Sequence, residues 1–341
     1  MRNSLPRWTD GVVLFDKPTG ISSQKAVTIV KHACHADKAG HTGTLDPLAT
    51  GLLAVCLGEA TKYSQDLLNA DKTYITTMMF GVKTDTGDAE GKKVGQVATS
   101  QEAFDPKNFA AKLEQLTPQF VGNILQVPPM YSAIKRDGKP LYAYAREGEM
   151  FDLEPRHVRI NHLTWLSVVW PVAVLEVSCS KGTYIRSLIN DLGDALGCGA
   201  HMTALRRTQI GHINIALAQQ ELAIKTAPEI LPVDALITHL PELIFNHDLA
   251  IRCKMGQRLL FKDVLTDADM SSWQQFNQPI KIYYSHKSSE QFMGLVELRD
   301  GVLHPKRLMA TDRLENLLAQ GVNTCQTSDT LELQNSTNPI H

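Results

Sequence analysis

Several features that mark particular protein classes are missing from this sequence of 341 residues. It has only 6 cysteines and no CxxC pair, which argues against a zinc ribbon and against a disulfide scaffold. The longest apolar stretch, around residues 168–175, contains Pro171 and falls far short of the roughly 20 residues of a membrane-spanning helix. The first residues lack the apolar core of a signal peptide. We therefore expect a cytoplasmic protein with reduced cysteines and no membrane segment.

A strong charge of either sign is also missing. Lys and Arg number 34 and Asp and Glu 36, and the pI is about 6.6. This lies well below the value above ~9 that is typical of a nucleic-acid-binding domain. Composition alone therefore does not indicate RNA binding, and an anionic partner would need a local cationic patch. The apolar fraction of 43% is near the globular average, and the length suits about two domains.

Strands and helices are both predicted from the spacing of apolar residues. Strand-like segments are found at residues 11–15, 74–80 and 172–180. Helices are expected after Ser22 or Ser23, after Asp105 and over residues 184–197. Because the elements lack a strict βαβ rhythm, we predict an α+β fold.

The character of the chain changes near Pro241. Short β-like pieces and an Asp-Gly turn signal at Asp300 follow, which predicts a small β-rich domain over residues 243–310. The first domain is then expected to span residues 1–242. The polar end, residues 311–341, is expected to be a disordered tail outside the core.

The most unusual local segment is the loop GHTGTLDPLATG, residues 40–51. Pro47 disfavours helical geometry at Asp46, and the glycines allow a substrate to approach the backbone closely. An isolated Asp-Pro pair more often only starts a turn, and a lone histidine such as His41 is more often structural. The loop by itself does not identify a reaction.

Five further segments give this loop a context. They are VLFDKPTGISS, LGEATKYSQDLLNADKTY, TDTGDAEG, VPPMYSAIKRDGKPLYAYAREG and CSKGTYIRSLINDLGDALGCGAHMTALRRTQIG. Together with GHTGTLDPLATGLL they cover most of residues 11–212. In amino-acid sequence and in order they resemble the motifs of the TruB-type tRNA pseudouridine synthases.

The resemblance implies both a fold and a function. The implied fold is that of the pseudouridine synthases, an α+β fold with a mixed, largely antiparallel central sheet and flanking helices. A PUA-like RNA-binding domain follows, to which residues 243–310 are weakly similar. The implied activity is isomerisation of uridine 55 in the T-loop of tRNA to pseudouridine, without cofactor or metal. The implied partner is the T-arm of tRNA, with no obligatory protein partner and a monomeric enzyme.

The resemblance also implies the catalytic residues. Asp46 matches the nucleophilic aspartate, Tyr74 the tyrosine that stacks on the target base, and Arg186 the arginine that pairs with the aspartate. These roles make physical sense, because a flipped base loses its stacking and a buried carboxylate needs a cation to remain ionised. Without the resemblance, Tyr74 would be read as a core aromatic and Arg186 as a solvated helix residue.

Four more positions are implied to be near the substrate. His41, Tyr184 and Leu205 match residues that line the uridine or tRNA site, and Lys17 matches a residue of a motif near the active site. Whether Asp46 attacks the ribose, attacks C6 of the base, or stabilises a developing sugar cation is left open by the sequence.

Other candidate sites are weaker. Arg206 and Arg207 with His201 are candidates for phosphate contacts, with a solvated face as the equal alternative. Metal sites are not expected, since neither of two groups of polar residues has the spacing of metal ligands. These groups are Asp85, Asp88 and Glu90, which are interpreted as a solvated turn, and His32, Cys34 and His35.

Two rival functions differ in class from the isomerase. One is a non-enzymatic tRNA-binding or tRNA-folding factor that uses the same surface. It would not need a buried carboxylate beside anionic RNA, so Asp46, Tyr74 and Arg186 together favour catalysis. The other is a metal-dependent RNA-cleaving hydrolase, for which the sequence offers no credible ligand cluster.

Overall fold

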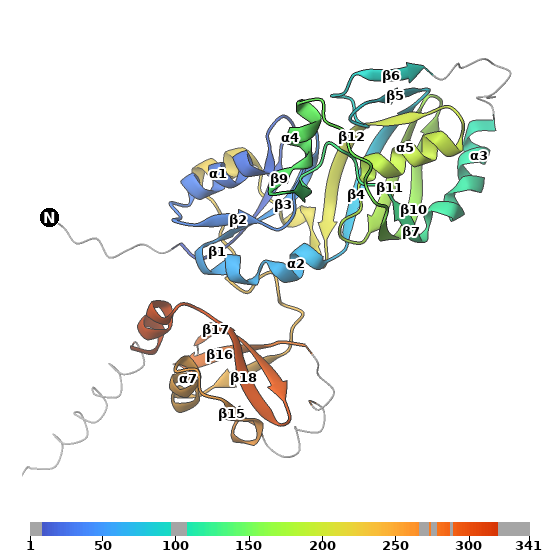
Figure 1. Ribbon diagram of the computed structural model, residues 1–341. Helices are drawn as coiled ribbons and strands as arrows, with labels where there is room; N and C mark the ends of the chain where they lie inside the picture. The colour runs from blue at the N-terminus through green and yellow to red at the C-terminus, as the bar shows by residue number, and fades with distance from the viewer. Residues whose placement is uncertain (1–8, 97–107, 266–272, 274–277, 287–288, 320–341) are drawn as a thin grey trace, which may run out of the picture. The chain divides into compact units, whose positions relative to one another are not determined.

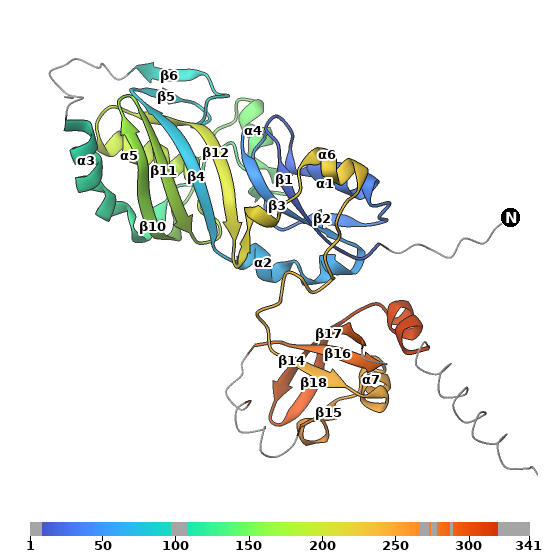
Figure 2. The same cartoon turned by 180° about the vertical axis from the view of Figure 1, so that it is seen from behind.

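The computed structural model describes residues 9–96, 108–265, 273, 278–286 and 289–319. The chain divides into two compact units, Met1–Leu231 and Pro232–His341. Figures 1 and 2 show each unit built around its own sheet. Among the described residues, no helix has the length and apolar character needed to span a bilayer.

The first unit is built on a nine-stranded sheet with the main order β1-β3-β12-β4-β11-β10-β7. The strand β2 pairs with β3 at one side of this path, and β13 pairs with β12. Neighbours along the path are antiparallel except β3 and β12, which are parallel. The predicted mixed, largely antiparallel sheet is therefore confirmed. The strands are β1 (Gly11–Lys17), β2 (Ala39–His41), β3 (Thr50–Leu57), β4 (Lys72–Phe80), β7 (Gly122–Gln126), β10 (Arg156–Val169), β11 (Val172–Cys179), β12 (Ala200–Ile210) and β13 (Ile213–Asn214).

Helices flank this sheet. Figures 1 and 2 show α3 and α5 on the same face of the part formed by β4, β11 and β10. At the other end, α1 packs with α6 against β1 and β3. As expected, the Ser22 side chain caps α1 by accepting a hydrogen bond from Lys25 N at 3.1 Å. The helices are α1 (Ser23–Ala33), α2 (Gln65–Asn69), α3 (Phe109–Leu116), α4 (Leu141–Arg146), α5 (Ile185–Ala195) and α6 (Glu221–Thr226), and Asp105, expected to start α3, lies outside the described residues.

Two small hairpins extend from the sheet. One pairs β5 (Val82–Thr84) with β6 (Lys93–Gln96), and the other pairs β8 (Lys135–Arg136) with β9 (Lys139–Pro140). Asp137 and Gly138 join the second pair, with φ angles of 51° and 81°. Two positive φ angles in a two-residue turn are typical of type I′ geometry, which explains the Asp-Gly sequence.

The second unit is a five-stranded sheet with the order β14-β16-β17-β18-β15. The predicted β-rich C-terminal module is confirmed, including the turn at Asp300 and Gly301, where φ is 49° and 72°. Its elements are β14 (Glu242–Phe245), α7 (His247–Lys254), β15 (Leu259–Leu260), β16 (Ile280–His286), β17 (Ser289–Arg299) and β18 (Val302–Leu308).

The expectation of a tail outside the core is wrong for residues 311–319. These residues are helical, and Leu314 and Leu318 are 1% and 5% exposed within the core of the second unit. Leucines four residues apart fall on one face of a helix, so this short amphipathic segment can dock. The prediction of a tail over residues 311–341 rested on the polar residues after Cys325, which do not belong to this helical segment. Residues 320–341 lie outside the described part of the chain.

Candidate active site

The loop that carries Asp46 connects β2 to β3 and is anchored on both sides of the aspartate. Leu45 and Ala49 are buried in the main core, and Ala49 N donates to Asp46 O at 3.1 Å. The buried Ser23 hydroxyl lies against the Leu45 backbone, because Leu45 N donates to its Oγ at 2.8 Å. Gly20 N donates to Pro47 O at 2.8 Å. The carboxylate of Asp46 therefore projects from a fixed backbone.

Lys17 anchors the same loop through hydrogen bonds to backbone carbonyls. Its side chain is buried, and its ammonium donates to Ile21 O at 2.8 Å, to Pro18 O at 2.9 Å and to Pro47 O at 3.4 Å. Burial lowers the pKa of Lys17 to about 8, and the Asp46 carboxylate opposes that shift. Lys17 thus links the end of β1 to the Asp46 loop.

Arg186 comes from the first turn of α5, in the other half of the unit. The start of this helix is fixed by the buried Gln126, whose amide accepts from Tyr184 N at 2.8 Å and donates to Tyr184 O at 3.1 Å. The guanidinium of Arg186 donates to Thr86 O at 2.9 Å and to Tyr131 O at 2.7 Å. Backbone carbonyls therefore determine where this cation points.

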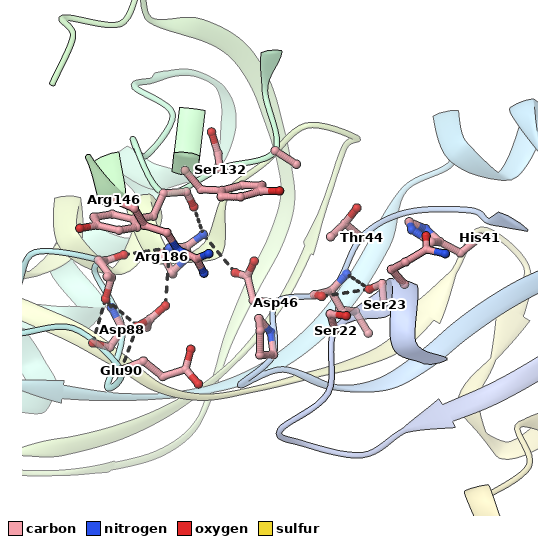
Figure 3. Close-up of a pocket in the computed structure, with 17 residues that line it drawn as sticks. Ser22, Ser23, His41, Thr44, Asp46, Asp88, Glu90, Ser132, Arg146 and Arg186 are labelled. Carbon is pink, nitrogen blue, oxygen red and sulfur yellow. Dashed lines mark hydrogen bonds and ion pairs between the residues drawn. The ribbon is translucent and has the colours of Figure 1, made fainter. Parts of the chain in front are cut away.

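Two carboxylates share the Arg186 guanidinium (Figure 3). Its Nη2 lies 3.1 Å from Asp46 Oδ2, and its Nη1 lies 3.5 Å from Asp88 Oδ2. The side chains of Arg186 and Asp88 are each 6% exposed, whereas that of Asp46 is 37% exposed. Asp88 is also held by the Thr86 hydroxyl at 2.6 Å and by Glu90 N at 3.1 Å. Asp88 is thus enclosed, and Asp46 remains open to a substrate.

The electrostatics of Asp46 follow from these neighbours. Burial raises the pKa of the Asp46 carboxyl above its ordinary value, and the charge of Asp88 raises it further. The Arg186 guanidinium acts in the opposite direction, as does the ammonium of Lys17. Arg186 is therefore the main group that favours the ionised form of Asp46.

Asp46 and Arg186 line two neighbouring cavities. The smaller, of about 270 Å³, is also lined by Tyr74, Tyr184 and Leu205. The larger, of about 440 Å³, includes His41 at its far side from Arg186 (Figure 3). One cavity thus combines a partly exposed carboxylate, its cation and two aromatic rings, which is a suitable setting for a planar base.

Comparisons with known proteins agree with this geometry. A family model described as TruB family pseudouridylate synthase (N terminal domain) matches residues 31–185. One described as tRNA pseudouridylate synthase B C-terminal domain matches residues 186–237. The chain belongs to the TruB family of pseudouridylate synthases.

Curated relatives extend the match. The chain is 45% identical over 311 residues to "tRNA pseudouridine synthase B" of Burkholderia mallei (strain NCTC 10247), covering 89% of this chain and 98% of the relative. It is 43% identical over 312 residues to the protein of that name from Cupriavidus pinatubonensis, covering 89% and 95%.

Solved structures show the same fold at lower identity. The Cbf5-Nop10-Gar1 complex contains a chain with a TM-score of 0.61 and 23% identity, covering 92% of this chain and 93% of its own length. An H/ACA RNP bound to a substrate RNA containing 2'-deoxyuridine gives 0.60 and 22%, covering 90% and 92%. The pseudouridine synthase fold expected from the sequence is thereby confirmed.

The structure brings together most of the site residues that the TruB-type motifs predicted. Asp46, Arg186, Tyr74, Tyr184 and Leu205 meet at the smaller cavity, although they are far apart in the sequence. His41 lies on the larger cavity, and its Nδ1 accepts from Gly43 N at 3.3 Å. Lys17 does not line either cavity but donates a hydrogen bond to Pro47 O in the Asp46 loop.

Asp88 is a residue of the site that the sequence analysis misjudged. It was interpreted as part of a solvated turn, but it is 4% exposed and pairs with Arg186. Asp88 can be buried because its carboxylate pairs with Arg186. Arg186 lies almost one hundred residues away in the sequence, so a local pattern does not indicate the pair. Among the described residues, no group of three or more His, Cys, Asp or Glu side chains is arranged to hold a metal ion.

The proposed phosphate contacts of Arg207 and His201 are wrong. Arg207 is 1% exposed, and His201 is buried with Nδ1 2.8 Å from Val82 O. Arg206 forms a bidentate pair with Asp16, at 2.8 and 3.0 Å. Gly51 is likewise not a site of substrate approach, because a Cβ there would lie 2.3 Å from Arg207 O of the paired strand β12.

Proposed function

We propose that this TruB-family chain isomerises uridine 55 in the T-loop of tRNA to pseudouridine. The observation that carries the proposal is the Asp46–Arg186 ion pair at the mouth of a cavity that also contains Tyr74. The names of the curated relatives and the motif match support tRNA as the substrate. The choice of uridine 55 rests on the motif resemblance alone.

The residues around the smaller cavity suit a flipped base. A uridine in a folded loop is stacked, so it must leave the stack to be reached. The Tyr74 ring can replace the lost stacking, which is worth roughly 1–3 kcal/mol per base. Leu205 supplies an apolar surface, and Tyr184 lines the same space. Asp46 then faces the nucleotide from a fixed loop, and Arg186 favours its ionised form.

The reaction needs no outside reagent, because the product has the same atoms as the substrate. The N1–C1′ bond breaks with the assistance of Asp46, and the base turns within the cavity. C5 then bonds to C1′, after which C5 loses its proton and N1 gains one. Three roles for Asp46 fit the geometry: attack on the ribose, attack on C6, and stabilisation of a sugar cation.

Binding of the tRNA T-arm is proposed to use cations around the cavities. Arg146 lines the larger cavity and the exposed Lys181 the smaller, and the hairpin next to Arg146 adds Lys135 and Arg136. Such groups position RNA through its phosphates. Residues 243–310 are proposed to be a PUA-like RNA-binding domain. A single chain supplies both members of the ion pair and the lining of both cavities, so we propose a monomer that needs no protein partner. We also propose that the protein is cytoplasmic.

The test is incubation of the full chain with an unmodified tRNA transcript, followed by base-resolved detection of pseudouridine. The proposal expects one modified position, uridine 55, and none in a transcript with cytidine there. A pseudouridine at another uridine would overturn the site assignment. Tight tRNA binding without any pseudouridine would overturn the enzymatic function in favour of a tRNA-binding or tRNA-folding factor.

A further inference from the structure

Helix α5, which carries Arg186, begins without a capping side chain of its own. Tyr184 is its N-cap residue, and the side chain of Tyr184 makes no capping hydrogen bond. The backbone N–H groups at the start of a helix have no partner within the helix and need one from elsewhere. Here the partner is Gln126, the last residue of β7, whose amide accepts from Tyr184 N at 2.8 Å and donates to Tyr184 O at 3.1 Å. A neighbouring strand thus caps the helix.

The contact has the pattern of a capping box that is shared between two segments. In a capping box, the third residue of the helix reaches back to the N–H of the N-cap residue. In α5 that third residue is Ser187, whose hydroxyl instead donates to Val127 O at 2.9 Å. Gln126 takes over the bond to Tyr184 N, so the two segments are tied in both directions. Gln126 and Ser187 are only 2% and 8% exposed, which shields these bonds from water.

These hydrogen bonds are not the main attachment of α5 to the sheet. Leu188, Ile189 and Leu192 are completely buried in the main core. Burial of such an apolar face supplies most of the stability of a helix in a folded protein. The bonds to Gln126 act on the first turn alone. Without them, we expect α5 to stay docked while its first turn gains freedom.

The first turn and its cap hold two side chains of the proposed active site. Tyr184 lines the smaller cavity, and Arg186 Nη2 lies 3.1 Å from Asp46 Oδ2. We propose that Gln126 is a positioning residue that places Arg186 opposite Asp46 by fixing the backbone of Tyr184. A misplacement of about 1 Å at a reacting group can slow catalysis by about 100-fold. The inference rests on the proposed function, because that function gives the Asp46–Arg186 pair its part in the reaction.

The test is Gln126→Met, which keeps the length of the side chain and removes both hydrogen bonds. Gln219→Met is the matched control, because the Gln219 amide binds the backbone N and O of Glu229 in the same way, at 2.8 Å each. Neither Gln219 nor Glu229 lines the two cavities. Gln126→Met should slow single-turnover pseudouridine formation by about 10- to 100-fold and keep the tRNA dissociation constant within about twofold. Gln219→Met should change neither.

The pH dependence of the rate gives a second readout. Burial raises the pKa of Asp46, and of the charges that act on it, Arg186 has the largest effect, ahead of Asp88 and Lys17. If the Arg186 guanidinium moves away, the pKa of Asp46 rises further, and the rate is lost at a higher pH on acidification. The acid limb of the pH–rate profile of Gln126→Met should therefore lie roughly half a pH unit or more above that of the wild type. A change in stability alone would not move it.

Three results would overturn the proposal. They are a wild-type rate for Gln126→Met, an equal loss of rate in Gln219→Met, and a slower Gln126→Met reaction with an unshifted acid limb, since Gln126 would then act on something other than Arg186. If Gln126→Met does not fold, Gln126→Asn decides by the same two measurements, because the shorter amide cannot reach both backbone groups of Tyr184. Failure of the wild-type chain to form pseudouridine would instead refute the proposed function.

Discussion

The two units of this chain bury different kinds of side chain. Among the described residues, the first unit buries several charged groups near its cavities, whereas the second buries Lys281 in an otherwise apolar core. In the first unit the buried charges include Lys17, Lys72, Asp88, Arg186 and Arg207. Buried charges are expensive and need specific partners, so their concentration agrees with the proposed placement of the active site in the first unit.

The difference predicts how each unit responds to substitution. In the first unit, changes at the charged groups should act on the reaction more than on folding, provided that no buried charge is left unpaired. In the second, changes in the core should act on folding and leave the chemical step intact. The following substitutions test that division, from the largest expected effect on pseudouridine formation to the smallest.

Among the substitutions that leave Asp46 itself in place, Arg186→Gln should have the largest effect. It removes the cation that lowers the pKa of Asp46, and it leaves the buried Asp88 carboxylate without its cationic partner. We expect the single-turnover rate to fall on the order of 100-fold or more, as for loss of one member of a buried charge pair. Stability should also fall, by about 3–5 kcal/mol.

The double variant Arg186→Gln with Asp88→Asn separates these two effects. Removing the unpaired carboxylate should recover much of the lost free energy of unfolding, measured by denaturant titration. The rate should remain low, because Asp46 still lacks its cation. Recovery of the rate together with stability would show that Arg186 is only structural.

Tyr74→Ala should weaken both capture and turnover. The loss of a stacked ring is expected to reduce tRNA affinity by about 1–3 kcal/mol, measured by filter binding. Tyr74→Phe is the control, since it keeps the ring and should keep the affinity. Equal affinity for the wild type and Tyr74→Ala would contradict a stacking role.

Leu314→Ala should leave the chemical step unchanged and destabilise the second unit. A buried leucine replaced by alanine costs about 2–5 kcal/mol, so thermal unfolding of this unit should shift clearly downwards. Asn316→Ala, on the exposed side of the same helical segment, should not shift it. A loss of rate at saturating tRNA in folded Leu314→Ala would break the division between the units.

Motifs and periodicity were sufficient to predict the fold class, several strands and three of the helices, α1, α3 and α5. The alternation of Leu175, Val177 and Cys179 predicted a half-buried strand, and all three are buried in β11. Local patterns work there because each depends on neighbours in the same strand or turn.

Distant charge partners were not predictable in the same way. Asp88, Arg207 and His201 were all expected at the surface, yet all three are buried. Their burial depends on groups that the fold brings together from other segments, such as Arg186 for Asp88 and the carbonyl oxygens of Leu52 and Gly43 for Arg207. Similarly, the short helix with Leu314 and Leu318 was not predicted. These two leucines are buried against the core of the second unit, and that contact cannot be seen in the local sequence.

The measurement that tests the account most directly is single-turnover pseudouridine formation by Asp46→Asn, with tRNA affinity measured on the same preparation. Asparagine keeps the size and much of the hydrogen bonding of Asp46 but removes its nucleophilic charge. We predict turnover below detection, with affinity equal to the wild type or slightly tighter because a carboxylate facing RNA phosphates is gone. Formation of pseudouridine at near wild-type rate by this variant would contradict the assignment of Asp46 and the mechanism built on it.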